Sequence, residues 1–224
     1  GCSELTDFQI PETATLLGDN AFSGCNKLTE IIIPKKLESV GQNCFKNCKG
    51  ITKINLDPLT TKYSVNSFEG CTSLSLMIIN TVKDTIPEFG DSAFKNVTEV
   101  IIPDNVTKLG TRAFANFYSL DSIKLPDSID TIENRAFLNC MRLKSIEIPS
   151  KVKVIEESCF SGCSQLCQVT FLGEMEKIEK NAFYDCSSLI QFDIPEKVTE
   201  ICEGTFCGCS KLNKIEIKEK ITSI

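Results

Sequence analysis

The sequence contains no histidine and no tryptophan. Histidine is the most frequent metal ligand and acid–base residue, so its absence removes the usual centre of both kinds of chemistry. The chain also has no glycine-rich phosphate loop and no G-x-S-x-G nucleophile motif. An enzyme needs a positioned acid, base or nucleophile in a cavity. We therefore expect a protein that is not an enzyme, with no catalytic residue, no bound metal and no cofactor.

Two further absences limit the possible partners. Lys and Arg total 24 against 30 Asp and Glu, the net charge is −6 and no basic cluster occurs. Because phosphate binding needs a basic surface, we expect no nucleic-acid partner. There is no run of eighteen apolar residues, so we expect no direct insertion into a membrane.

What the sequence has in abundance is a repeat of 23 residues. The phrase A-F-x-x-C-x-x-L-x-x-I-x-I-P-x-x-V-x-x-I-G recurs about ten times with almost nothing left over. A fixed period of this length predicts a solenoid, in which small units that cannot bury their apolar side alone stack on copies of themselves. We therefore expect residues 1–224 to form one solenoid domain. Because the chain starts and stops within a repeat, we read it as a fragment of a longer array without caps.

Each repeat contains two periodicities. Apolar pairs separated by one residue, such as Ile31 and Ile33, predict a strand with one buried side, and Pro34 ends it. A spacing of three, as from Phe22 to Cys25 to Leu28, predicts a helical or 3₁₀ turn. Each coil should therefore contain a main strand, a short second strand and this turn. The phenylalanine column, which we expect to stack in the core, comprises Phe22, Phe45, Phe68, Phe94, Phe114, Phe137, Phe160, Phe183 and Phe206.

The thirteen cysteines allow three interpretations. Column cysteines of adjacent coils would lie about 5 Å apart, within the Cα range of a disulfide, but their side chains should run parallel. Zinc is disfavoured because there is no histidine and no pair of C-x-x-C motifs. We favour free, buried thiols that behave as small hydrophobic residues. The column three residues after each Phe comprises Cys2, Cys25, Cys48, Cys71, Cys140, Cys163, Cys186 and Cys209.

Residues 25–34 (C-N-K-L-T-E-I-I-I-P) and 136–143 (A-F-L-N-C-M-R-L) carry a clear resemblance. They closely resemble the BspA-like class of leucine-rich repeats, and the likeness covers essentially the whole chain. It implies a curved leucine-rich-repeat solenoid with the parallel sheet on its concave face. It also implies a surface protein of mucosal bacteria or protists that adheres to host matrix or cell-surface proteins. The matching residues are structural, so no binding residue is carried over.

The residue between each buried pair of the main strand should face outward, on the surface that solenoids present to ligands. Among these residues are Ile32, Ile78 and Ile101, and with Leu76 beside them they predict a contiguous exposed apolar patch. Patches of this kind mark interaction sites. The alternative is that β-branched residues simply favour strands.

A second candidate binding residue is Phe89, which lies in the inserted loop Pro87-Glu88-Phe89 of one irregular coil, outside every repeat column. An aromatic side chain on an exposed loop is a suitable anchor for a partner. The alternative is that the ring folds back and fills the gap left by the missing part of the repeat.

Two functional classes follow. The first is an adhesin-type module, at the cell surface or secreted, that binds a host or neighbouring-cell protein. The second is an intracellular scaffold or regulatory subunit in the cytoplasm, which abundant reduced thiols favour. We expect no signal peptide or membrane anchor within this fragment. Asn96 and Asn105 begin N-x-T triplets, the acceptor pattern for N-glycosylation, which matters only in a secreting eukaryote.

The ends of the stack are expected to be uncapped. Their open strand edges predict end-to-end self-association.

Overall fold

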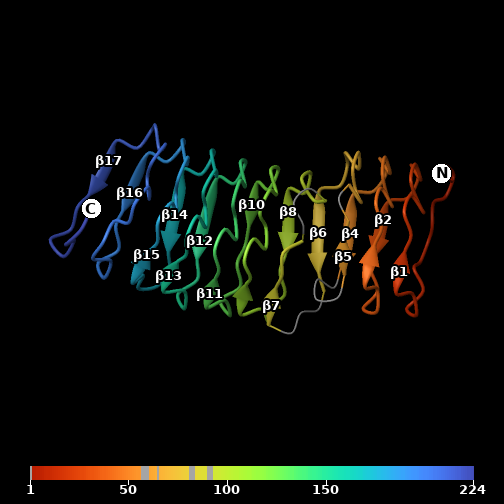
Figure 1. Cartoon of the computed structure of the whole chain (residues 1–224), viewed down its shortest axis with the longest axis horizontal. Helices are drawn as coiled ribbons and strands as arrows, with labels where there is room; N and C mark the ends of the chain where they lie inside the picture. Colours follow the sequence, from red (N-terminus) through yellow and green to blue (C-terminus); the bar gives the residue numbers. More distant parts are fainter. Residues whose placement is uncertain (1, 57–60, 65, 81–83, 90–92) are drawn as a thin grey trace.

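The protein is an elongated stack of coils that succeed one another from one end to the other, as the computed structural model shows (Figure 1). It describes residues 2–56, 61–64, 66–80, 84–89 and 93–224. The chain ends lie at opposite ends of the stack. The predicted solenoid is therefore confirmed.

The main strands run parallel in three successive sheets, and within each sheet a residue pairs with one 23 positions away, as Ile31 does with Ile54. Alternate side chains point inward, because successive Cβ atoms of a strand project to opposite faces. Nine main strands are present in the described residues, so eight complete turns connect the first to the last. The copy at residues 8–10 is not in a strand. The main strands are β2 (Glu30–Ile32), β4 (Lys53–Leu56), β6 (Leu76–Ile79), β8 (Glu99–Ile101), β10 (Ser122–Ile123), β12 (Ser145–Ile148), β14 (Gln168–Phe171), β16 (Gln191–Asp193) and β17 (Lys214–Glu216).

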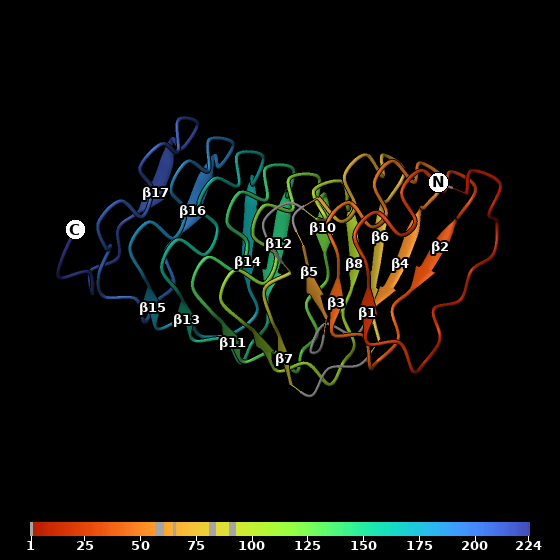
Figure 2. The ribbon, with the colours of Figure 1, turned by 45° about the vertical axis from the view of Figure 1, so that its right-hand side comes forward.

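Short second strands form a further row, which Figure 2 shows along the lower edge of the stack for the C-terminal coils. Each has two residues, of which the second is buried in nearly every coil, and each pairs in parallel with its neighbour. They are β1 (Leu16–Leu17), β3 (Ser39–Val40), β5 (Lys62–Tyr63), β7 (Thr85–Ile86), β9 (Lys108–Leu109), β11 (Thr131–Ile132), β13 (Val154–Ile155) and β15 (Lys177–Ile178).

The third side of each coil differs from the predicted helical or 3₁₀ turn. Among the described residues these segments are runs of hydrogen-bonded turns without a helix. The reason is a pair of left-handed residues around most column Phe residues, as Arg135 (φ 58°) and Asn139 (φ 59°) flank Phe137. The Phe137 amide donates to the Cys159 carbonyl of the next coil (2.9 Å), whereas the Cys140 amide donates to Phe137 within its own coil (3.2 Å). A continuous helix would direct all of these amides along its own axis.

The phenylalanine column forms the spine of the core. Phe137 stacks on Phe160 with ring centroids 5.3 Å apart and an interplanar angle of 4°, and Phe160 stacks on Phe183 at 5.6 Å and 4°. All three side chains are fully buried. The equal spacing follows from the ladder, which places each ring one strand separation above the last. The prediction that these rings stack in the core is confirmed.

The cysteine column runs beside the rings, and all thirteen cysteines are free. The Cys163 thiol donates to the carbonyl of Phe137, 26 residues earlier (3.2 Å), and Cys186 does the same to Phe160 (3.3 Å). Burial raises the pKa of Cys71 to about 12 and that of Cys48 to about 11. The buried thiols therefore bond one coil to the next, and those of Cys48 and Cys71 stay protonated at neutral pH.

Phe89 lies inside the core and not on the surface, with only 4% of its side chain exposed. Its ring centroid is 5.9 Å from that of Phe94 and 6.1 Å from that of Phe114, so it fills the step between these two column rings. The ring folds back because the irregular coil otherwise leaves a void, which costs stability in a packed interior. Phe89 is therefore a core residue, and its predicted role as an exposed anchor does not hold.

Candidate functional site

The outward row of the main sheet carries the predicted apolar residues. The register places Ile78 of β6 directly beside Ile101 of β8, and Leu76 lies two residues before Ile78 on the same face. Ile101 is 45% exposed, and Leu76 and Ile78 are partly exposed. Leu76, Ile78 and Ile101 together form the apolar patch of the sheet.

Ile32 is exposed but does not join the apolar patch. Asn55 lies between Ile32 and Ile78 in the ladder. The Asn55 amide donates a hydrogen bond to Glu30, and Lys53 forms an ion pair with the same carboxylate at 2.9 Å. This polar group separates Ile32 from the other three residues, so the predicted single patch of four residues is wrong in this detail.

The far border of the apolar patch is hollowed. A depression of about 320 Å³ lies over β8 and β10 and includes Ile101 in its wall. Glu99, Asp104 and Lys124 supply charged groups around it. An apolar centre with a polar border is the usual anatomy of a protein–protein contact surface.

A larger groove of about 1100 Å³ lies over β14 and β16, towards the C-terminal end, and reaches Lys218 and Lys220 beyond β17. Its floor includes Val169 and Phe171. Both are partly exposed, whereas the equivalent residues of β12, Ile146 and Ile148, are buried. The candidate residues predicted from the sequence lie only at the apolar end of the sheet, so this groove was not among the predictions.

Charged side chains surround the groove near its proline-containing turn. Glu174 and Lys197 form an ion pair at 2.6 Å that joins the coil of β14 to the coil of β16. The Lys197 ammonium lowers the pKa of Glu174. Lys218 lies 3.0 Å from Glu216 and 3.7 Å from Glu196, and its pKa is raised, chiefly by the hydrogen bond to Glu216.

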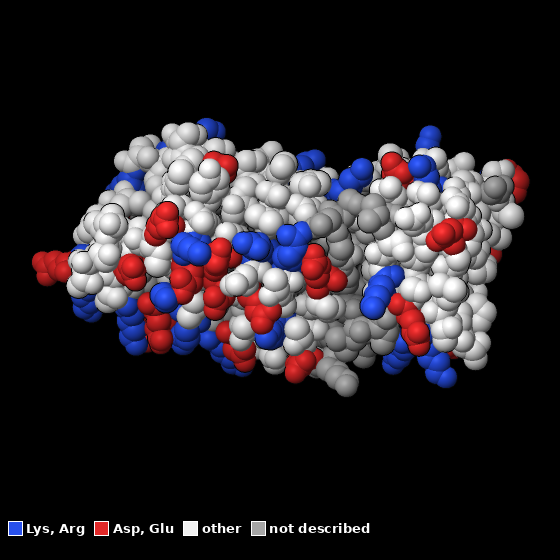
Figure 3. All heavy atoms as spheres, in the orientation of Figure 1, with Lys and Arg blue, Asp and Glu red and all other residues white. Residues whose placement is uncertain are grey.

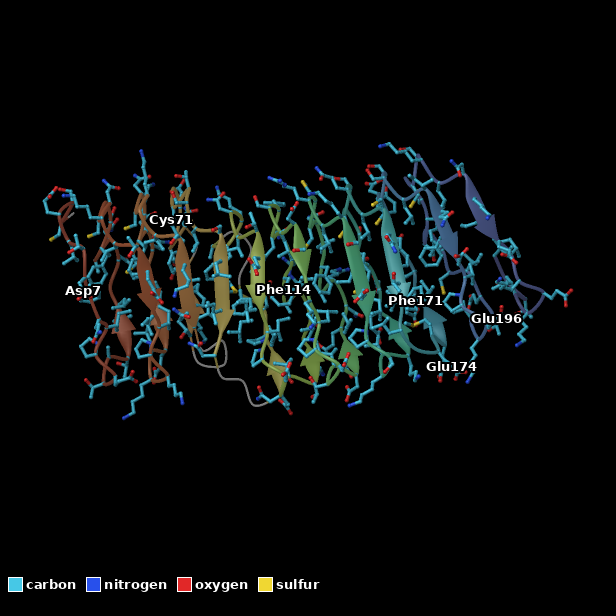
Figure 4. All side chains as sticks on the ribbon, turned by 180° about the vertical axis from the view of Figure 1, so that it is seen from behind. Asp7, Cys71, Phe114, Phe171, Glu174 and Glu196 are labelled. Atoms are coloured by element: carbon cyan, nitrogen blue, oxygen red, sulfur yellow. The ribbon has the colours of Figure 1, made fainter. Side chains whose placement is uncertain are left out.

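Two views show how charge is distributed at this end of the molecule. Figure 3 shows side chains of both signs gathered over the C-terminal half of the face that it presents. Figure 4 shows Phe171, Glu174 and Glu196 near one another at that end, well away from Cys71. Because both signs are present in the groove, its surface does not resemble a site for a polyanion.

A sequence signal for the groove exists. Phe171 and Phe192 occupy strand columns that hold aliphatic residues in most other coils, such as Ile148 and Ile146 of β12, although Phe8 lies in the same column as Phe192. Larger side chains at repeated positions predict a local change of packing. In the described part of the chain, no group of three or more His, Cys, Asp or Glu side chains is placed to hold a metal ion.

The repeating coil, with its phenylalanine and thiol columns, matches a known sequence pattern. The pattern described as the BspA type leucine-rich repeat region (6 copies) matches residues 1–99, 88–202 and 131–224. The chain belongs to the BspA-type leucine-rich repeat family. A comparison with curated protein sequences finds no significant match.

Solved structures of leucine-rich repeat proteins resemble this chain. A leucine-rich repeat protein from Bacteroides ovatus is 26% identical, with a TM-score of 0.61, over 100% of this chain and 69% of its own. One from Eubacterium ventriosum is 15% identical, with a TM-score of 0.54, over 91% of this chain and 70% of its own, and shows the fold alone. Among the described residues, no helix is long and apolar enough to cross a membrane.

Proposed function

We propose that this BspA-type chain is a non-catalytic, protein-binding module of the adhesin type that acts at a cell surface or after secretion. The observation that carries the proposal is the apolar patch on the outer face of a rigid parallel sheet. Ile101 and Ile78 lie side by side there, although alternation would allow polar residues at both positions. Exposed apolar area with a polar border favours a protein partner.

The partner that fits this surface is an extracellular matrix or cell-surface protein. Support for this choice comes from the family to which the chain belongs. The apolar patch lies on strands held on both sides by the ladder, so little conformational entropy is lost when a partner binds. The depression beside Ile101 offers room for one side chain of the partner.

The test is a pull-down with matched variants. Immobilised protein is exposed separately to an extracellular matrix preparation and to a cell lysate. Ile101→Asp places a charge in the apolar patch, and Ile32→Asp places the same charge on the same row, beyond Asn55. We expect a matrix protein to be retained by the wild type and by Ile32→Asp but lost by Ile101→Asp. Equal retention by both variants would contradict the proposed surface.

A second function is favoured by one observation. All thirteen cysteines are free, and most are buried, as suits a reducing compartment. This supports an intracellular scaffold or regulatory subunit that uses the same face. In the pull-down, retention of a partner only from the cell lysate would favour the scaffold over the adhesin.

A further inference from the structure

The stack contains two steps at which neighbouring coils are paired along neither row of strands. β10 and β11 belong to one coil and β12 and β13 to the next, yet β10 forms no ladder with β12, and β11 forms none with β13. The coil of β14 and β15 and the coil of β16 are likewise unpaired. At every other step that the structure describes, at least one row is paired. These two steps are called the first joint and the second joint.

At the first joint, backbone bonding is weak along both rows. The Glu156 amide, which follows β13, donates to no described backbone carbonyl, whereas the equivalent Glu179 amide one coil later donates to Ile155 at 2.9 Å. The Lys144 amide, which precedes β12, reaches the Asp121 carbonyl only at 3.5 Å, which is long for a hydrogen bond. β10 and β12 therefore remain neighbours without forming a ladder.

The second joint repeats this arrangement. The Ile190 amide, which precedes β16, donates to no backbone carbonyl in the described part of the chain, whereas the Asn213 amide one coil later donates to Ile190 at 3.0 Å. The larger groove lies over this step, and Val169 and Phe171 of β14 are partly exposed beside it. The equivalent residues of β12 are buried. The coils at the second joint are therefore packed less closely on the side of the main strands.

On the third side, the turns stay bonded across both joints. The Phe114 amide donates to Ala136 at 2.8 Å across the first joint, and the Phe160 amide donates to Ala182 at 2.9 Å across the second. Column thiols bond the same pairs of turns. Each joint is therefore attached along one edge and unpaired along the other two. This is the arrangement of a hinge.

Exposed ion pairs bridge the joints where the ladders do not. Asp121 lies 2.9 Å from Lys144 and 3.7 Å from Arg142 across the first joint. Glu174 lies 2.6 Å from Lys197 across the second. Such pairs are weak and are screened by dissolved salt, whereas the neutral groups of a backbone ladder are not. The joints should therefore resist bending less than ladder-bonded steps do, and less still at high salt.

We propose that the stack bends at these two joints and behaves as three rigid parts hinged along their turns. The parts are the described residues up to 132, then 134–178 and 180–224, and the ion pairs of Asp121 and Glu174 hold the joints closed. The apolar patch lies wholly in the first part, on one continuous five-stranded sheet, so its residues keep their relative positions. The larger groove lies across the second joint and changes width as that joint opens. The proposal does not depend on the proposed function.

Two matched spin-label distances test the bending. Lys124→Cys with Glu216→Cys places nitroxides across both joints, and Ile32→Cys with Lys124→Cys places them within the first part. Both pairs are four repeat periods apart in the sequence, or about 19 Å along the stack at about 4.8 Å a step. Double electron–electron resonance gives the distribution of each distance. The cysteines that are not buried are first replaced by Ser, namely Cys2, Cys167, Cys202 and Cys207.

We expect the distribution across the joints to be about twice as wide as the one within the first part. Raising the salt from about 0.01 M to about 1 M shortens the screening length from about 30 Å to about 3 Å, so it should broaden the distribution across the joints only. Asp121→Asn combined with Lys197→Gln should reproduce the high-salt width at low salt. Equal widths for the two pairs, or a width across the joints that ignores salt, would overturn the proposal.

Hydrogen exchange tests which edge acts as the hinge. The Phe114 and Phe160 amides, which bond across the joints, should exchange as slowly as the Phe137 amide between them. The Ile190 amide should exchange at least about tenfold faster than the Asn213 amide, because it has no ladder bond. Rapid exchange at Phe114 and Phe160 would overturn the proposal, since the coils would then separate on all three sides. Equal protection of Ile190 and Asn213 would overturn it as well.

Discussion

At the scale of single residues, stability is concentrated in columns. Each column residue packs against the equivalent residues of the two neighbouring coils, so the same packing contact recurs along the stack. Phe137 is fully buried between Phe114 and Phe160, at ring separations of 5.6 and 5.3 Å. By contrast, Tyr184 directly follows a column Phe but is 38% exposed.

Truncation of a column ring should therefore be costly. We expect Phe137→Ala to lower the free energy of unfolding by about 3–5 kcal/mol, because it removes buried area and leaves a cavity between two rings. Urea unfolding followed by circular dichroism measures the change. Tyr184→Ala serves as the control and should shift the free energy by less than about 0.5 kcal/mol. Similar urea midpoints for both variants would mean that the phenylalanine column does not stabilise the core.

The thiol column makes stability depend on alkaline pH. Burial raises the pKa of Cys44, Cys48 and Cys209 to about 11 from the ordinary 9.0. The folded state therefore binds more protons than the unfolded state above pH 9.0, and the stabilisation present below that pH is lost between 9.0 and about 11. The free energy of unfolding, measured at a series of pH values from below 9 upward, should fall as the pH rises above 9.

Two controls accompany this pH prediction. Cys48→Ala removes one thiol, so its stability should fall less steeply with pH than that of the wild type. In the native protein at neutral pH, a thiol reagent should modify the exposed Cys2, Cys167 and Cys207 and leave the buried column unmodified. Rapid modification of all thirteen cysteines without denaturant would show that the column opens readily.

At the scale of elements, left-handed residues shape the turn on the third side of each coil. Asn, Asp or Gly stands two residues after each column Phe and two residues before about half of them, as with Asn20 and Gly24 around Phe22, whereas Arg112, Arg135 and Ser158 take the earlier position in other coils. These residue types tolerate a positive φ, which other residues adopt only at a cost. The turn geometry therefore depends on these positions as much as on the apolar spacing.

Three glycines test this dependence by the same substitution. Gly18→Ala meets no atom within 4 Å and has no positive φ, so its stability should stay close to that of the wild type. Gly24→Ala has a φ of +75° without a close contact and should lose roughly 1–2 kcal/mol. Gly162 has the same φ, and a Cβ at this position would also lie 2.3 Å from Oδ1 of Asn139. Gly162→Ala should therefore lose more stability than Gly24→Ala. Thermal unfolding ranks the three variants, and any other order would contradict the turn geometry.

At the scale of the whole molecule, the coils follow one another along the stack (Figure 1), and the contacts between strands join neighbouring coils. Stability in such proteins is close to a sum of coil and interface contributions. A local defect should therefore stay local. The two breaks in the main-strand pairing, between β10 and β12 and between β14 and β16, illustrate this, since the strands beyond each break pair regularly again.

Hydrogen exchange can test this locality. Phe45→Ala removes a ring that stacks on Phe22 and Phe68 at 5.4 and 5.2 Å. We expect faster amide exchange in β2, β4 and β6 and little change in β12 and β14. A uniform loss of protection along the whole stack would indicate global cooperativity and contradict the solenoid description of its energetics.

Much of the fold could be predicted from the sequence, because a repeated pattern states the same constraint in every coil. The alternation of Ile31 and Ile33 indicated the main strand, and the recurrence of Phe indicated the stacked rings. The helical turn was predicted wrongly, since spacing alone does not reveal the positive φ at residues such as Asn139. The recurrent Asn and Gly at these places were the signal that would have corrected it.

The sequence alone determined the period, the inward and outward alternation and the family, since each depends only on residue identity at regular intervals. The tertiary structure decided what depends on irregular positions. It placed Phe89 in the core, separated Ile32 from the apolar patch and opened the groove beside Phe192. These outcomes follow from side-chain volume and contacts between coils, and contacts of that kind exist only once the coils are stacked.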